Sequence, residues 1–318
     1  MPPTHIDWTR WCDQQVRDLA WCCLTPPLMS SLPATDATPW QVEASPALLQ
    51  WLDQLAADPE PLKRHLAAVK STRLGLYFEQ LWIFLWQQDP AMELLSHNQQ
   101  ITRQGKTLGA FDFLLQDQSA GQSRYWHLEA ALKFYLGSHP TSRQWQDWTG
   151  PNTEDTLAHK LNRLRTHQLR LSQLPEWQNW QPASGIPLSA FARRTLLAGR
   201  FYAPWQTPQL LPDGGNPLLD KALWCHRQDL DKVLQKVVQS GRGKILSRQQ
   251  WLAPALNEGD LESFDTLAGQ LPNALSHALQ LAFFQPAKES NTMPMIETLR
   301  LFVLPDHWPN TATPERNT

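Results

Sequence analysis

Residues 107–137 contain two apolar runs that flank a polar, glycine-containing connection. Such a pattern is typical of two strands joined by a hairpin or a slightly longer loop. Side chains alternate between the two faces of a strand, so the second run places its apolar residues on one face and His127, Glu129 and Lys133 on the other. The first run carries Asp112 between two phenylalanines. The sequence therefore predicts charged groups on two neighbouring strands.

These charged positions have more than one interpretation. Two acids and a lysine are costly to bury unless they pair with one another or bind a metal. The alternatives are a solvated face of an antiparallel sheet and a buried ion pair between Lys133 and one of the acids. The elements around the two strands bear on this choice.

The pattern elsewhere predicts helices and strands in alternation. The expected helices lie at residues 5–24, 46–57, 61–88 as one helix or in two parts, 152–174 and 218–238, with a further helical piece after Pro272. The further expected strands lie at residues 94–104, 192–204 and 297–304. Because a parallel strand needs a crossover connection, the central order of helix, three-strand meander, helix and strand predicts an α/β fold with a mixed sheet.

Composition and loop positions predict how the chain is divided. A chain of 318 residues is long enough for one large or two ordinary domains, and a Pro- and Gly-rich stretch follows residue 204. We expect a helical extension at 1–60, an α/β core at 61–205, a smaller α/β segment at 206–310 and a disordered polar tail at 311–318.

The charge of the chain is nearly balanced overall but uneven along it. The net charge is −2, whereas residues 160–248 contain fourteen Lys and Arg against five Asp and Glu. This local excess could face phosphate groups, or it could be a solvated basic surface. The sixteen Trp offer stacking surfaces, although we expect most of them in the core.

Cysteine usage and hydropathy indicate the compartment. The spacing of Cys12, Cys22, Cys23 and Cys225 contains no C-x-x-C pair, which argues against a structural zinc site and favours free thiols. The first residues lack the pattern of a signal peptide, and the longest apolar stretch is too short to span a bilayer. We expect a soluble cytoplasmic protein with no membrane partner. No P-loop, dinucleotide, serine-hydrolase or zincin motif is present.

The order of elements, together with Glu79 on the helix, Asp112 on the second strand, and Glu129 and Lys133 on the third, resembles the core of the PD-(D/E)XK nuclease superfamily. The resemblance implies that Asp112 and Glu129 hold a divalent metal, magnesium or manganese, with help from Glu79. It also implies that the lysine orients or activates the attacking water and that the partner is DNA or RNA. From the residues alone, an exposed acid on a helix is the commoner interpretation of Glu79.

The chain also looks like a bacterial family catalogued as domain of unknown function 1853. The stretches that carry this likeness are residues 74–82, 109–115, 127–137, 150–152 and 199–202, with a further stretch at 302–309. They cover roughly residues 70–205. The family likeness implies no activity of its own.

One departure from the superfamily pattern concerns the lysine. The superfamily places an acid two residues before it, but that position is Ala131, and Glu129 lies four residues before Lys133. Four residues of strand separate the two Cα atoms by roughly 13 Å. Either Glu129 is the metal ligand and another group serves as the base, or Lys133 keeps its role and the acid has migrated.

Several residues could complete such a site. The following helix carries three candidates for the missing group, Lys160, His167 and Gln168. His127 shares the face of Glu129, where we expect it to be structural or to support a ligand. The alternative to a metal-dependent nuclease is a degenerate domain of the same fold that binds nucleic acid or protein without cleaving it.

Overall fold

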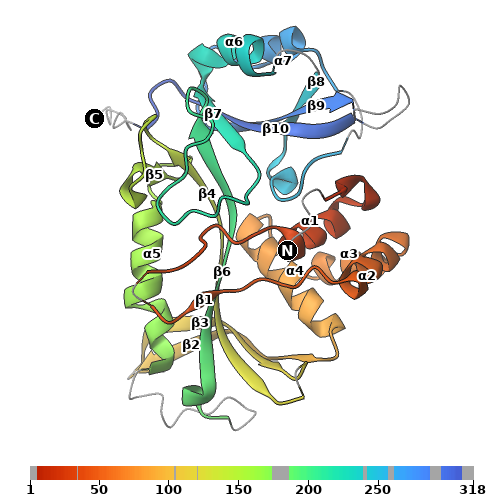
Figure 1. The fold of residues 1–318 in the computed structure, drawn as a ribbon, viewed down its shortest axis with the longest axis vertical. Helices are drawn as coiled ribbons and strands as arrows, with labels where there is room; N and C mark the ends of the chain where they lie inside the picture. The colour runs from red at the N-terminus through yellow and green to blue at the C-terminus, as the bar shows by residue number, and fades with distance from the viewer. Residues whose placement is uncertain are drawn as a thin grey trace.

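The computed structural model describes most of the chain, and Figure 1 labels its elements. The described residues are 6–33, 35–103, 105–119, 121–173, 186–238, 242–256, 261–286 and 295–309. The α-helices among them are α1 (Gln14–Leu24), α2 (Pro46–Ala57), α3 (Glu60–Ala67), α4 (Leu74–Gln88), α5 (Leu157–Thr166), α6 (Leu230–Val233) and α7 (Phe264–Gln270). The strands are β1 (Thr38–Pro39), β2 (Met92–Arg103), β3 (Lys106–Asp117), β4 (Arg124–Gly137), β5 (Trp148–Thr149), β6 (Phe191–Pro204), β7 (Ala222–His226), β8 (Arg242–Leu246), β9 (Leu279–Pro286) and β10 (Met295–Leu304). The predicted tail at 311–318 lies outside the described residues.

The strands of the described chain form one mixed sheet. Its order is β2-β3-β4-β6-β7-β10-β9-β8, with β1 beside β6 and β5 beside β4. The centre is parallel, from β4 through β6 and β7 to β10, and both ends are antiparallel. The predicted meander of β2, β3 and β4 and the parallel return to β6 through α5 are confirmed, as is the α/β class with a mixed sheet.

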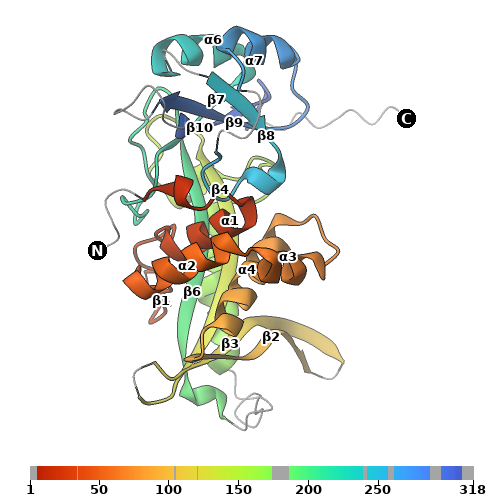
Figure 2. The ribbon, with the colours of Figure 1, turned by 90° about the vertical axis from the view of Figure 1, so that its right-hand side faces the viewer.

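Helices cover both faces of the sheet near β4 and β6. Figures 1 and 2 show α1 to α4 packed on one face and α5 on the other, with α6 and α7 at the end formed by β7 to β10. The helix predicted at 61–88 is two helices, α3 and α4, and α4 is apolar over most of its surface because it is buried among its neighbours. Thr156 caps α5 by accepting the N–H of His159 at 3.1 Å.

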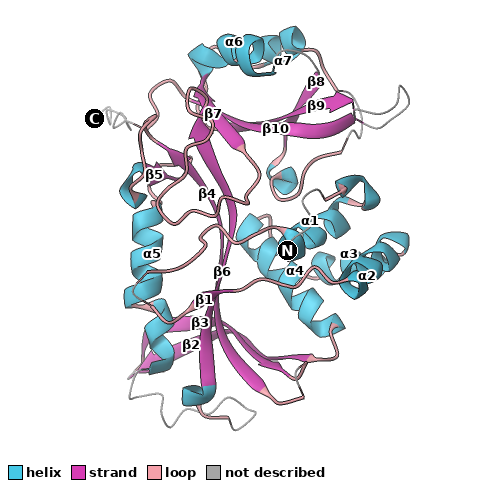
Figure 3. Cartoon of the chain, in the orientation of Figure 1, coloured by secondary structure: helices cyan, strands magenta, loops and turns pink. Residues whose placement is uncertain are grey.

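Long central strands link the two ends of the molecule. Figure 3 shows β4 and β6 running from the end with β2 and β3 toward the end with β7 and β10. The sheet therefore continues across residue 205, where we placed the boundary between the α/β core and the smaller segment. None of the helices in the described part of the chain is long and apolar enough to cross a membrane.

Buried charged side chains hold the segment 250–254 against the sheet. Arg300 donates hydrogen bonds to the carbonyl oxygens of residues 250, 251 and 253 at 2.9 to 3.1 Å. Arg200 donates to those of residues 251 and 252 at 2.9 and 2.6 Å. From α1, Arg17 donates to the carbonyl oxygen of residue 254 at 3.0 Å, and Asp18 accepts the N–H of residue 253 at 3.0 Å. The segment thereby joins the N-terminal helix, β6 and β10.

Two predictions for the C-terminal third were wrong. Residues 222–226 form the buried strand β7 instead of continuing a helix, because a parallel strand covered on both faces is apolar throughout and mimics a helical stripe. The helix expected after Pro272 lies before it as α7, where the Ser263 hydroxyl accepts the N–H of Thr266, and β9 follows.

Candidate functional site

The two acids identified on the strands lie where β3 and β4 separate. The last paired residues of the two strands are Phe113 and Leu128. Asp112 and Glu129 are their neighbours on the unpaired side. Past this point, the Asp112 carboxyl accepts the backbone N–H of Ala130 at 2.8 Å. The Asp112 carboxyl thus replaces a backbone carbonyl of β3 as the acceptor for this N–H of β4. The hydrogen bond holds Asp112 between the two strands.

Glu129 is fixed through both oxygens. It is 1% exposed, and its Oε1 lies 2.8 Å from His127 Nε2, while Gln168 Nε2 donates to Oε2 at 2.6 Å. Gln168 begins a 3₁₀ segment (Gln168–Gln173) directly after α5, and its own oxygen accepts a hydrogen bond from Lys160 Nζ at 3.1 Å. A continuous chain of hydrogen bonds therefore joins Lys160 to Glu129.

His127 is neutral and orients the Glu129 carboxyl. Burial lowers the pKa of this imidazole to about 3. A neutral imidazole has one N–H, and the carboxyl of Glu129 is the stronger acceptor, so Nε2 donates to it and Nδ1, 3.2 Å from Ser172 Oγ, accepts from that hydroxyl. This agrees with the supporting role expected for His127.

The acids perturb one another strongly. Burial and the nearby charge of Glu129 raise the pKa of Asp112 to about 7, and burial raises the pKa of Glu129 to about 7 as well. Two partly and fully buried carboxyls near one another resist ionisation together, so the pair binds a proton more readily than two separate acids would. Burial and the charge of Asp112 raise the pKa of Glu79, on α4, to about 6.

Lys160 supplies the positive charge at this site. Burial lowers its pKa, while Glu129 and Asp112 act in the opposite direction. Lys160 belongs to α5 and Glu79 to α4, two helices that lie on opposite faces of the sheet (Figure 1). Three acids, a lysine and an amide from five elements therefore converge where the strands separate.

Lys133 has a different partner from the one that the resemblance implies. Its ammonium lies 2.5 Å from the carboxyl of Asp155, in the loop before α5, and it forms no bond to Glu129 among the described contacts. The separation of Glu129 and Lys133 along β4 explains this. The structure keeps Lys133 apart from Glu129, and the choice between the two alternatives left by the sequence stays a prediction.

His167 does not join the acids in the described contacts. It is exposed at the end of α5, where its imidazole lies over Gly109 of β3. Sequence reasoning missed two contributors, Asp155 as the partner of Lys133 and Ser172 as the partner of His127. Asp155 lies in a loop and Ser172 in a short 3₁₀ segment, and neither position carries a periodic signal that would have identified it.

The donor set fits a hard divalent cation. Within the described residues, no three His, Cys, Asp or Glu side chains are arranged as a metal-binding group. Magnesium, however, is commonly held by one or two carboxylates, with water and substrate phosphate completing its shell. Asp112 and Glu129 provide two neighbouring oxygen-donor groups with raised pKa values, and a cation would compete with protons for them.

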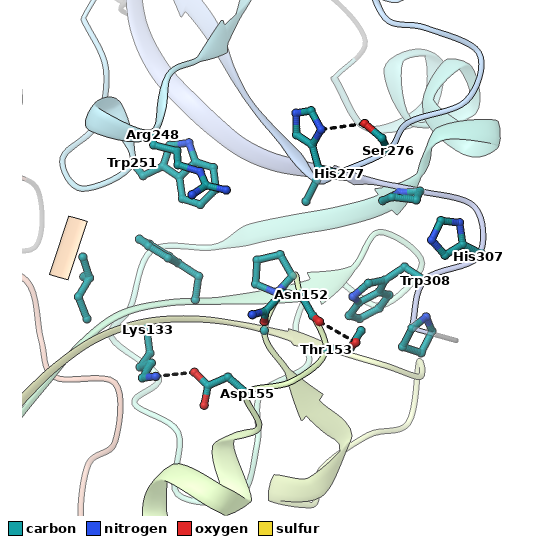
Figure 4. A pocket seen from close by; sticks show the side chains of 17 residues that line it. Lys133, Asn152, Thr153, Asp155, Arg248, Trp251, Ser276, His277, His307 and Trp308 are labelled. Atoms are coloured by element: carbon teal, nitrogen blue, oxygen red, sulfur yellow. Dashed lines mark hydrogen bonds and ion pairs between the residues drawn. The ribbon is translucent and has the colours of Figure 1, made fainter. Parts of the chain in front are cut away.

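A pocket of about 520 Å³ lies further along β4, and Figure 4 shows its lining. Lys133 and Asp155 form part of its wall. Its lining mixes aromatic and polar side chains and does not include Asp112 or Glu129.

Comparison with known proteins places this α/β chain in a family. Residues 17–304 match the family described as Domain of unknown function (DUF1853). The match covers most of the chain, so the protein belongs to this family, as its sequence indicated. No curated protein and no solved structure matches the chain.

Proposed function

We propose that this protein is a metal-dependent nuclease that hydrolyses phosphodiester bonds of DNA or RNA at Asp112 and Glu129. One observation carries the proposal. The carboxyls of Asp112 and Glu129 lie near one another and near Lys160, at the point where two strands separate, and the charge of Glu129 helps to raise the pKa of Asp112. Burying a charged carboxylate is costly unless it is paired, hydrogen-bonded or bound to a cation. Carboxyl groups with strongly shifted pKa values are therefore common at functional sites.

The order of elements supports the same proposal. The sequence α4, β2, β3, β4, α5, β6 has the helix, meander, helix and strand order of the PD-(D/E)XK core that the chain resembles. Glu79, Asp112 and Glu129 occupy the helix and strand positions of the acids in that pattern. We infer that Lys160, from α5, takes the place of the lysine that the pattern puts on the third strand.

Asp112 and Glu129 would hold magnesium or manganese, and Glu79 would add negative charge nearby. The cation, when bound, supplies positive charge at the phosphate and lowers the pKa of a water molecule. Lys160 adds a hydrogen-bond donor with a lowered pKa, suited to negative charge developing on phosphate oxygens. His127 and Gln168 keep the Glu129 carboxyl in one orientation.

Basic residues near the site fit a polyanionic substrate. Arg163 and Arg165 lie on α5, and Arg170 lies in the 3₁₀ segment that also carries Gln168. Arg163 and Arg170 are exposed. Cations beside the acids would offset the repulsion between carboxylates and a phosphate backbone.

The test compares wild type with Asp112→Asn and with a control, Glu93→Gln, at an exposed acid of β2. Each protein is titrated with magnesium or manganese, followed by thermal unfolding and by cleavage assays on plasmid, linear and single-stranded substrates. A cation at 100 times its dissociation constant should stabilise the wild type and the control by about 2.7 kcal/mol. Both this stabilisation and cleavage should be lost in Asp112→Asn.

The opposite result supports the degenerate alternative. If wild type and Asp112→Asn respond equally to metal and neither cleaves, the nuclease proposal fails. Retained binding of nucleic acid in both proteins would then identify a domain that binds without cutting.

A further inference from the structure

The pocket along β4 is built by distant parts of the chain. β4, the loop before α5, the segment around residues 248–251 and the residues after β10 contribute its walls (Figure 4). Its volume of about 520 Å³ is in the range of pockets that hold small ligands. The hydrogen bonds that Arg200 and Arg300 donate to the carbonyl oxygen of Trp251 fix one wall.

Two indole rings of the lining are held in place by other aromatic rings. Trp251 meets Phe134 and Phe302 edge-on, with ring centroids 5.6 and 5.1 Å apart. Trp308 meets Trp224 in the same way at 4.8 Å. A ring that is already immobilised loses little conformational entropy when a flat ligand packs against it. The pocket therefore offers preorganised surfaces for an aromatic group.

The polar groups of the pocket favour an anion. Among the seventeen described residues that line it, Asp155 is the one acid, and it is paired with Lys133. Arg248 adds a second cation, with its guanidinium 5.9 Å from the centre of the Trp251 ring. His277 and His307 contribute imidazoles. Aromatic surface beside a surplus of cationic groups is suited to a ligand with a flat ring and a negative charge.

We propose that this pocket binds a single unpaired nucleotide, with its base against the indole rings and its phosphate at Arg248 and Lys133. Stacking of a base on an aromatic side chain and pairing of a phosphate with a guanidinium are independent contributions to affinity. The pocket accepts one nucleotide unit and not a duplex, because a 520 Å³ cavity has no room for a base pair with its backbones.

The position of the pocket gives this nucleotide a role, and that role rests on the proposed nuclease function. Between Glu129 and Leu136, β4 has no strand partner on the side of β3 in the described chain, and the carboxyl pair and the pocket lie at successive positions along this unpaired stretch. Lys133 is near enough to Lys160 for their charges to interact. The nucleotide in the pocket would anchor a single strand whose phosphodiester backbone runs to Asp112.

Calorimetric titration tests the binding step separately from catalysis. Deoxyadenosine monophosphate, deoxyadenosine and inorganic phosphate are titrated in EDTA into wild type, Arg248→Gln, Asp112→Asn and Arg242→Gln. Arg242 is exposed on β8 and does not line the pocket, which makes it a charge-matched control. Arg248 is also exposed, so its replacement should leave folding intact.

We expect the monophosphate to bind more tightly than phosphate or deoxyadenosine. Losing a charge-assisted hydrogen bond should weaken it about tenfold or more in Arg248→Gln. Asp112→Asn and Arg242→Gln should bind it as the wild type does. Equal binding by Arg248→Gln and wild type, equal binding of phosphate and monophosphate, or no saturable binding would each overturn the pocket assignment.

Cleavage kinetics test the anchoring role. With a short single-stranded substrate, Arg248→Gln should raise KM more than it lowers kcat, and Arg242→Gln should change neither. An unchanged KM in an active enzyme would overturn the anchoring role. A wild type that binds the monophosphate but never cleaves would instead contradict the nuclease proposal and leave the pocket assignment standing.

Discussion

Two lysines near β4 have different surroundings, and their roles can be separated by kinetics. Lys160 is linked through Gln168 to Glu129, and Lys133 is paired with Asp155 at the pocket. We predict that Lys160→Met lowers kcat about a hundredfold or more, because it removes the cation beside the acids. Lys133→Met should act mainly on KM.

The pH profile distinguishes a direct role of Lys160 from a structural one. Its charge lowers the pKa of Asp112, so its removal should move the acidic limb of the rate profile to higher pH. Lys221→Met, at an exposed lysine, is the control and should match the wild type. An unshifted profile with unchanged kcat in Lys160→Met would assign the positive charge to another residue.

The raised pKa values of the acids predict how stability varies with pH in the absence of metal. The folded pKa of Asp112 is about 7, above the value of about 4 expected when unfolded, so the folded state holds more protons between these limits. The stability from this group is therefore complete below about pH 4 and is lost as pH rises through 7. Asp18, whose pKa burial raises to about 6, acts in the same direction.

Asp112→Asn should therefore stabilise the metal-free protein at pH 8, by about 1–3 kcal/mol. Urea unfolding in EDTA at pH 5 and pH 8 measures this. Asp117→Asn is a control of opposite sign, because Ser119 and Arg124 lower the pKa of Asp117 and its charge stabilises the fold above about pH 4. The explanation fails if Asp112→Asn is no more stable than wild type at pH 8.

A single glycine allows β4 and β6 to pair beside the pocket. Gly199 pairs with Lys133 in the parallel register and has φ of +140°. A Cβ there would lie 1.6 Å from the carbonyl oxygen of Lys133, and neither backbone can move without breaking the strand pair. We predict that Gly199→Ala destabilises the protein by about 3 kcal/mol or more.

Gly269 provides the matched control for that substitution. It lies in α7, with open space where a Cβ would be, so Gly269→Ala should stabilise by about 0.5–1 kcal/mol through helix propensity. Chemical denaturation of both variants gives the comparison. Similar effects of the two substitutions would show that the close approach at Gly199 relaxes without cost.

Strand patterns identified the acids of the site but not their partners. Asp112 and Glu129 stood out because each interrupts an apolar run, and alternation fixed the face of Glu129. The Lys160–Gln168–Glu129 chain depends on how α5 crosses the sheet, which local periodicity does not determine. The partner of Lys133 lies 22 residues away in a loop, and the pocket joins segments separated by more than 150 residues, so neither leaves a local signal.

Helices and strands were predicted correctly where their buried residues recur at the regular spacing of one helix face or one strand face. The strands at β3, β4 and β6 have recognisable faces or flanking turns, and their order predicted the mixed sheet. β7 and β9 were misjudged because both lie inside the sheet and carry short, mainly apolar runs that do not alternate with polar residues. The length of an apolar run does not separate a buried strand from a buried helix when both are short.

The continuous sheet and the segment 250–254 predict that the whole molecule unfolds as one unit. Arg300 is 2% exposed, pairs with Glu297 and donates to three carbonyl oxygens of that segment. Arg17 and Asp18 attach α1 to the same segment, and so the N-terminal helix depends on contacts with residues 237 and 235 positions later in the chain. Replacing Arg300 should therefore lower the free energy of unfolding of the whole molecule.

We predict that Arg300→Met destabilises the protein by about 3–5 kcal/mol, because it leaves the buried charge of Glu297 and the carbonyl oxygens without their partner. The double variant with Glu297→Met should recover part of this loss, since it removes the uncompensated charge. Arg242→Met, at an exposed position, should change stability little. Denaturation followed by far-ultraviolet circular dichroism and tryptophan fluorescence should give coincident transitions in all four proteins. A biphasic curve, with residues after 205 unfolding first, would instead show that the sheet joins two units that fold independently.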